Sequence, residues 1–156
     1  MMPKDTNYYS TMGSPFVSFV DLLQVNRHYN CSAELSKCPK EKQTKCMNNG
    51  FHDPRNCGRC ICPGGYGGEL CNKKPDDCGM AMPNAKNEWT TIELKTPNSN
   101  NDGKYKICTS WIQAEGGRRI EVGLVNITGG IEDSVGCDVA GIEIKAIEDQ
   151  RLTGYR

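Results

Sequence analysis

Three cysteines and a histidine lie close enough in the sequence to bind a metal, exchange electrons or form disulfides. Cys57, Cys60 and Cys62 follow one another in the spacing C-x-x-C-x-C, and His52 precedes them in a short loop. Thiolates and imidazole are zinc ligands, and a C-x-x-C pair can be a redox motif. Zinc requires reduced thiolates, however, and no βαβ pattern surrounds the pair, so disulfides are the favoured interpretation.

The overall composition supports an oxidising compartment. The chain has 10 cysteines in 156 residues, far more than a reduced compartment favours. Two N-x-S/T sequons, at Asn30 and Asn126, predict glycosylation and therefore secretion. Lys and Arg equal Asp and Glu at 19 each, so no nucleic-acid partner is expected. No apolar run approaches the ~18 residues of a membrane helix.

The elements that carry these residues fall into three zones, residues 1–31, 32–77 and 78–156. In the first zone Phe19, Leu22, Leu23, Val25 and Tyr29 recur at near-helical spacing. Ser18 can cap this helix, and Asp21 completes a box-like S-x-x-D start. Because a lone amphipathic helix is marginal in water, we expect it to pack on a partner, which we place upstream of this chain.

The third zone changes to short β-type runs separated by turn-rich segments such as Pro97 to Gly103 and Glu115 to Gly117. The runs are Trp89 to Leu94, Tyr105 to Cys108, Ile120 to Val125 and Ile142 to Lys145. This pattern predicts an antiparallel β-sandwich. The fold class expected for the whole chain is therefore mostly β and built from several modules.

The second zone ends on a spacing that resembles the closing half of an EGF-like module. Cys60-Ile61-Cys62 is followed by Pro63-Gly64-Gly65-Tyr66-Gly67-Gly68-Glu69-Leu70 and then Cys71. We expect the four glycines of this loop to supply positive φ values. Six cysteines alone allow fifteen pairings. The resemblance implies Cys38–Cys57, Cys46–Cys60 and Cys62–Cys71, in a small β-hairpin module held by its bridges.

The third zone begins in a way that resembles a CUB domain. Cys78-Gly79 follows the polar linker, which runs from Asn72 to Asp77. The next cysteine is Cys108, and Cys137 opens a later run that ends at Ile144. The resemblance implies a Cys78–Cys108 bridge and a partner for Cys137 further along the chain. Since no such cysteine follows, we expect an incomplete CUB-like domain in which Cys137 is unpaired by truncation.

The first zone resembles the last segment of an astacin-family catalytic domain. The resemblance rests on Pro3 to Ser14, on Ser18 to Leu23 and on Asn26 to Cys31. It implies a terminal helix whose Cys31 bridges to an earlier part of that domain, so Cys31 would be the second cysteine left unpaired. Together the zones resemble the C-terminal part of secreted, nematode-type astacin zinc metalloproteases. A cysteine-rich chain without a visible signal peptide also predicts a fragment.

The catalytic chemistry of that family requires residues that this chain lacks. Astacins hold zinc through HExxHxxGxxH, whose glutamate activates the metal-bound water. The only histidines here are His28 and His52, and neither belongs to an H-E-x-x-H pair. Ser10-Thr11-Met12 could be mistaken for the Met-turn that lies beneath the zinc in this family. That turn reads S-x-M-H-Y, however, and here Met12 is followed by Gly13 and Ser14. We therefore expect zinc only in the parent protease, and no catalysis by these residues alone.

Calcium is the remaining candidate metal, since carboxylates are its usual ligands. We interpret the carboxylates that could bind it as solvated loop residues. These candidates are Glu34, Glu93, Asp102, Glu132, Asp133 and Asp138.

The expected partners are extracellular protein substrates or matrix proteins that bind the EGF-like and CUB-like modules. Two alternatives stay open: a non-catalytic secreted binding protein made of the same modules, and a degenerate, inactive astacin.

Overall fold

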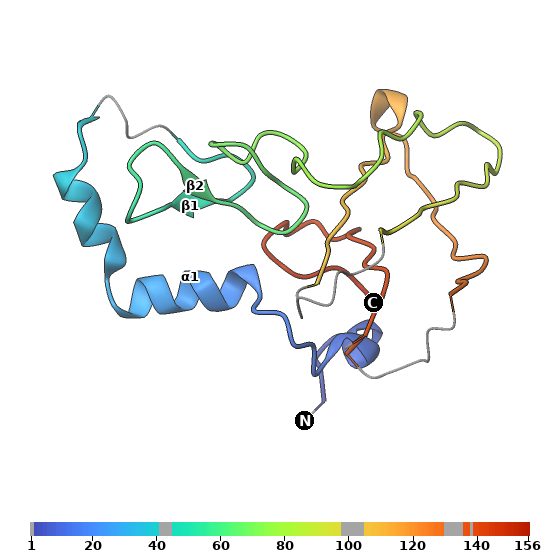
Figure 1. The fold of residues 1–156 in the computed structure, drawn as a ribbon, viewed down its shortest axis with the longest axis horizontal. Coiled ribbons are helices and arrows are strands. Elements are labelled where there is room, and N and C mark those ends of the chain that lie inside the picture. Colours follow the sequence, from blue (N-terminus) through green and yellow to red (C-terminus); the bar gives the residue numbers. More distant parts are fainter. Residues whose placement is uncertain (1, 41–44, 98–104, 130–135, 138) are drawn as a thin grey trace.

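The structure, a computed structural model, describes residues 2–40, 45–97, 105–129, 136–137 and 139–156. In chain order its elements are the 3₁₀ helix η1 (Thr6–Thr11), the α-helix α1 (Phe19–His28), the 3₁₀ helix η2 (Cys31–Lys37), the strands β1 (Phe51–His52) and β2 (Cys60–Ile61), and the 3₁₀ turn η4 (Glu115–Gly117). Figure 1 shows α1 beside the strand pair at one end of the molecule and extended chain at the other. No helix in these ranges is long and apolar enough to cross a membrane.

Helix α1 begins at the capping box that the sequence predicts. The Ser18 hydroxyl accepts a hydrogen bond from the backbone N–H of Asp21 at 3.2 Å, and the Asp21 carboxylate accepts one from the N–H of Ser18 at 3.0 Å. The Ser18 hydroxyl also donates to the Asp21 carboxylate at 2.8 Å, and this bond together with the one from the Ser18 N–H lowers the pKa of Asp21. Arg27 and His28 occupy the last turn, where positive charge suits the helix dipole.

The helix packs on the strand pair through one aromatic contact. Strands β1 and β2 are antiparallel, with Phe51 opposite Ile61 and His52 opposite Cys60. The ring of Phe19, the first residue of α1, lies 5.5 Å from that of Phe51 in a tilted arrangement, and Phe19 is only 8% exposed. Tilted aromatic pairs at this separation stabilise beyond the area they bury, so this pair attaches α1 to the sheet.

Disulfide-bonded cysteines supply half of the named buried side chains. The buried side chains in the described ranges include Thr11, Phe19, Cys38, Cys60, Pro63 and Cys71. Cys71 is completely buried, and a Cβ added to Gly50 would lie 2.6 Å from its sulfur. Because this part of the chain is too small for an ordinary apolar core, its bridges replace one.

The loop between Cys62 and Cys71 turns with two of the four glycines that we expected. Gly65 and Gly68 have φ values of +88° and +75°, which only glycine adopts without strain. Gly64 and Gly67 do not have positive φ, so that expectation is wrong for them. Gly67 instead forms a two-way backbone bridge with Lys73, at 2.8 and 3.2 Å, which ties the loop to the linker that follows it.

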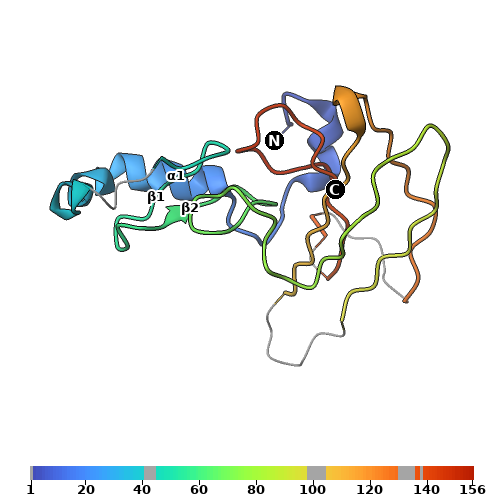
Figure 2. The same cartoon turned by 90° about the horizontal axis from the view of Figure 1, so that it is seen from above.

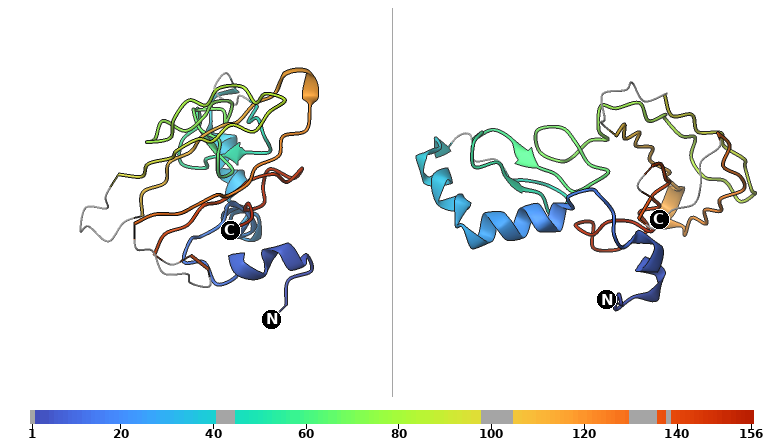
Figure 3. Two further views of the ribbon diagram at one scale, coloured as in Figure 1. Left: turned by 90° about the vertical axis from the view of Figure 1, so that its right-hand side faces the viewer. Right: turned by 60° about the horizontal axis from the view of Figure 1, so that its bottom comes forward.

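Residues 78–156 run as extended chain without a sheet in their described part, as Figures 2 and 3 show. None of the four runs expected as strands is assigned as one there. The nearest features are a hydrogen bond from Ala85 to Gln113 at 2.7 Å and the isolated bridge between Ile144 and Tyr155. Apolar side chains that a sandwich would bury are exposed, among them Val125 at 85%. The β-sandwich therefore stays a prediction, and most of its turn at Pro97 to Gly103 lies outside the described residues.

Candidate functional site

The chain's two histidines do not fit a zinc site. His28 is exposed, and its ring packs edge-on against Tyr29 at 4.9 Å. His52 lies in β1, where one of its nitrogens and the sulfurs of Cys46 and Cys60 lie within 4.8 Å of one another. Those two sulfurs are joined in a disulfide, so neither is a thiolate that could bind zinc. No step of zinc chemistry can be built on these residues.

The four disulfides of the structure are the four pairs that the resemblance implied. They are Cys38–Cys57, Cys46–Cys60, Cys62–Cys71 and Cys78–Cys108, with Cα–Cα distances of 5.5, 5.8, 5.2 and 4.6 Å. These separations lie within the usual range for a bridge. Cys31 and Cys137 carry free thiols, and both are half-buried.

One face of α1 is apolar and exposed, and it ends beside a free thiol. Leu22, Val25 and Tyr29 are 41%, 54% and 73% exposed. Their spacing of three and four residues places them in one stripe along the helix, which we call the helix stripe. Asn30 follows in a left-handed conformation with a φ of 49°, and Cys31 comes directly after it. An apolar stripe with a thiol at its end can bind a second surface and form a covalent bond to it.

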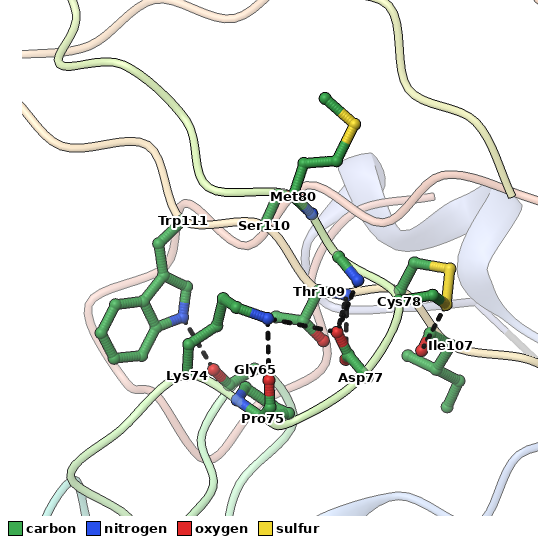
Figure 4. A network of polar contacts seen from close by, with 12 residues as sticks. Gly65, Lys74, Pro75, Asp77, Cys78, Met80, Ile107, Thr109, Ser110 and Trp111 are labelled. Atoms are coloured by element: carbon green, nitrogen blue, oxygen red, sulfur yellow. Dashed lines mark hydrogen bonds and ion pairs between the residues drawn. A yellow bond between two sulfur atoms is a disulfide. The ribbon is translucent and has the colours of Figure 1, made fainter.

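A second cluster joins the linker to the third zone, and Figure 4 shows its contacts. The N–H of Thr109 donates to both oxygens of Asp77, at 3.0 and 2.9 Å, and the N–H of Gly79 donates to one of them at 2.8 Å. Lys74 forms an ion pair with the same carboxylate at 3.3 Å. Burial raises the pKa of Asp77, but the hydrogen bonds from Thr109, Gly79 and Lys74 outweigh burial and lower it to about 2.

The same figure shows Trp111 reaching back to the loop between Cys62 and Cys71, which we call the disulfide loop. Its indole N–H donates to the carbonyl of Gly65 at 2.8 Å, and its ring meets that of Tyr66 edge-on at 5.6 Å. The Cys78–Cys108 bridge adjoins the Asp77 cluster, because Cys78 directly follows Asp77 and Cys108 directly precedes Thr109. The linker is therefore a structured joint. Sequence reasoning missed it, since a polar linker and a single tryptophan carry no signal of a common contact.

The two predicted glycosylation acceptors are both exposed. Asn30 accepts a hydrogen bond at 3.2 Å from the hydroxyl of Ser32, the third residue of its own sequon. Asn126 lies on an extended segment of the third zone. Both side chains are accessible to a modifying enzyme, as the sequon argument requires.

The calcium candidates are not brought together in the described ranges. Glu34 pairs with Lys37, and Glu93 pairs with Lys95 at 3.4 Å. Asp102, Glu132, Asp133 and Asp138 lie outside the described residues.

The chain is similar in sequence to several proteins that are named zinc metalloproteinases. Zinc metalloproteinase nas-31 of Caenorhabditis elegans is 41% identical over 162 aligned positions, which cover 100% of this chain and 25% of the relative. Zinc metalloproteinases nas-25 and nas-23 of the same organism are each 37% identical over 100% of this chain, and the match covers 39% and 28% of their lengths. The chain thus spans between a quarter and two-fifths of the length of these curated relatives. No protein-family model matches the chain, and no solved structure matches it.

Proposed function

We propose that this chain is the part of a secreted astacin-like zinc metalloendopeptidase that follows the zinc site. Residues 1–31 would be the tail of the peptidase domain, 32–77 an EGF-like module with its linker, and 78–156 a CUB-like domain. The observation that carries the proposal is the similarity of the entire chain to several zinc metalloproteinases. The agreement of the disulfides with the pairs that the family implies adds support.

Helix α1 has the chemistry to attach such a domain. The helix stripe of Leu22, Val25 and Tyr29 would be covered by the peptidase domain, and Cys31 would bridge to it. Burying three such side chains is worth several kcal/mol at ~25 cal/mol per Å² of apolar surface. The contact of Phe19 with Phe51, at the start of the helix, would transmit that position to the disulfide-rich part.

Zinc, when bound by the preceding domain, would supply the hydrolytic chemistry, and this chain would supply position. Its EGF-like and CUB-like modules would hold extracellular protein substrates or matrix partners near the catalytic domain. Asn30 and Asn126 would carry N-linked glycans, because both are exposed sequon residues.

A second candidate is a non-catalytic secreted protein that binds its partners through the same modules. It requires only the disulfide-bonded chain itself and no zinc domain. Reading the complete transcript separates the two proposals. An HExxHxxGxxH segment upstream, together with chelator-sensitive hydrolysis of a peptide by the full-length product, supports the protease. A transcript in which a signal peptide directly precedes these residues supports the binding protein.

A further inference from the structure

We propose that the loop from Ile144 to Tyr155, the C-terminal loop, is a docking surface that holds the other two zones of the chain against residues 78–156. This surface is a property of the 156-residue chain and does not depend on the protease proposal. Its partners are two segments of the same chain: the disulfide loop around Tyr66 and the N-terminal segment Asp5 to Phe16. Figure 1 shows the loop between those two segments.

The loop has a shape fixed by its own contacts. Ile144 and Tyr155 exchange two backbone hydrogen bonds, at 2.8 and 3.0 Å, which close it. Inside it, the guanidinium of Arg151 donates to the carboxylate of Asp149 at 2.7 and 2.9 Å. The amide of Gln150 donates to the carbonyl of Ile147. A closed, internally bonded loop presents its side chains at fixed positions, as a docking surface requires.

One side of the loop holds the disulfide loop. The ammonium of Lys145 donates to the carbonyl of Gly64 at 2.7 Å and lies 5.8 Å from the centre of the Tyr66 ring. The hydroxyl of Tyr66 donates to the side-chain oxygen of Gln150 at 3.2 Å. Burial lowers the pKa of Lys145, while Glu143 and Asp149 oppose that shift. Trp111 contacts the same disulfide loop from a neighbouring segment, so two segments of the third zone hold it.

The other side holds the N-terminal segment. The hydroxyl of Tyr8 donates to the carbonyl of Thr153 at 2.7 Å, and its ring lies 4.9 Å from that of Tyr155. The hydroxyl of Tyr155 donates to Asp5 at 3.2 Å. The residues of these contacts are 145 to 150 positions apart in the sequence.

Further contacts beside the loop extend this interface. The backbone N–H of Arg156 donates to the hydroxyl of Thr11 at 3.1 Å, and its guanidinium lies 5.1 Å from the Phe16 ring. The guanidinium is held from the other side by Glu143 at 2.8 Å. Independent hydrogen bonds, a ring pair and a cation–π contact at one interface define a specific docked state.

Docking on both sides fixes the direction of α1 relative to residues 78–156. The helix is tied to the disulfide-rich part through Phe19 and to η1 through the chain that precedes it. If the protease proposal holds, the N-terminal segment belongs to the peptidase domain. The C-terminal loop would then hold the third zone beside that domain, where it would affect access of protein substrates more than of short peptides.

The two native free thiols allow a direct test. Spin labels on Cys31 and Cys137 report the distance between the end of α1 and the third zone by double electron–electron resonance, without an added cysteine. We expect one narrow distance peak for the wild-type chain. Tyr8→Ala and Lys145→Ala should each broaden it or shift it, and the double variant should remove the single peak.

Matched controls separate undocking from a general effect of the substitutions. Tyr9 is 65% exposed and Lys86 is exposed, so Tyr9→Ala and Lys86→Ala should leave the peak unchanged. Disulfide mapping and the helical circular dichroism signal establish that each variant is folded. A broad wild-type distribution, or a peak that the folded Tyr8 and Lys145 variants do not change, would overturn the docking proposal. Neither result bears on whether a zinc domain precedes this chain.

Discussion

Opening the Cys62–Cys71 bridge is the perturbation whose effect can be worked out most fully. The bridge joins residues 9 positions apart, and Cys71 is completely buried. Replacing both cysteines with serine removes the loop constraint without leaving a lone thiol. The chain-entropy relation for a loop of this length gives a loss of about 2.6 kcal/mol in the free energy of unfolding. This corresponds to about 80-fold in the local unfolding equilibrium.

The same relation ranks all four bridges. The loops of Cys46–Cys60, Cys38–Cys57 and Cys78–Cys108 span 14, 19 and 30 positions. The corresponding losses are about 3.0, 3.2 and 3.6 kcal/mol. The smallest loop therefore gives the variant most able to remain folded, which makes it the one to measure.

Amide hydrogen exchange provides the assay for the Cys62→Ser, Cys71→Ser variant. The N–H of Cys60 donates to Glu69 at 2.7 Å and that of Met47 donates to Leu70 at 2.9 Å, so both amides report on this loop. We expect their protection to fall by about 80-fold, in line with the loop-closure free energy. Cys31→Ser is the matched control and should leave both unchanged, because its thiol is free. Unchanged protection in the double variant would refute the reasoning.

Three further substitutions test other parts of the structure. Ser18→Ala removes the cap of α1 and should lower the free energy of unfolding by about 1 kcal/mol, with a smaller helical circular dichroism signal, whereas Ser32→Ala should not change that signal. Phe19→Ala should lower the free energy of unfolding by about 3 kcal/mol in a denaturant titration, because it removes the contact with Phe51. Leu22 is exposed, so Leu22→Ala should lower it by less than about 0.5 kcal/mol. Equal losses for the two variants would contradict this packing. Asp77→Asn should lower stability at neutral pH by about 2 kcal/mol. The pKa of Asp77 is about 2 in the folded chain and 3.8 in the unfolded chain. The stability that Asp77 contributes is therefore fully present above about pH 4 and is lost as the pH falls through about 2. Urea titrations across that range should show this loss in the wild type and a flatter profile in the variant.

The sequence carries enough local information to predict α1 and the spacing of the disulfide-rich part. Ser18 and Asp21 predict the start of the helix because a capping box involves residues three positions apart. The alternation of Cys60 and Cys62 predicts that they bridge in different directions, and the structure joins them to Cys46 and Cys71. Local rules suffice where the interacting groups are close in the sequence.

The docking contacts could not be predicted in the same way. Tyr8 and Thr153 are 145 positions apart, and no periodicity relates them. Lys145 is expected only as the last residue of a β-type run and Trp111 lies in no predicted element, yet both hold the disulfide loop. Alternation predicts that a segment is extended, but pairing depends on a partner that the segment itself does not specify. The β-sandwich therefore stays a prediction.

The central claim is that this chain follows the zinc site of a metalloendopeptidase and attaches to the peptidase domain through α1 and Cys31. Disulfide mapping of the natural, full-length product under non-reducing conditions tests it most directly. The account predicts a peptide containing Cys31 linked to a cysteine upstream of residue 1, with the bridges of Cys38 to Cys108 unchanged. A Cys31 that stays free in that product, or that is joined to Cys137, would contradict it.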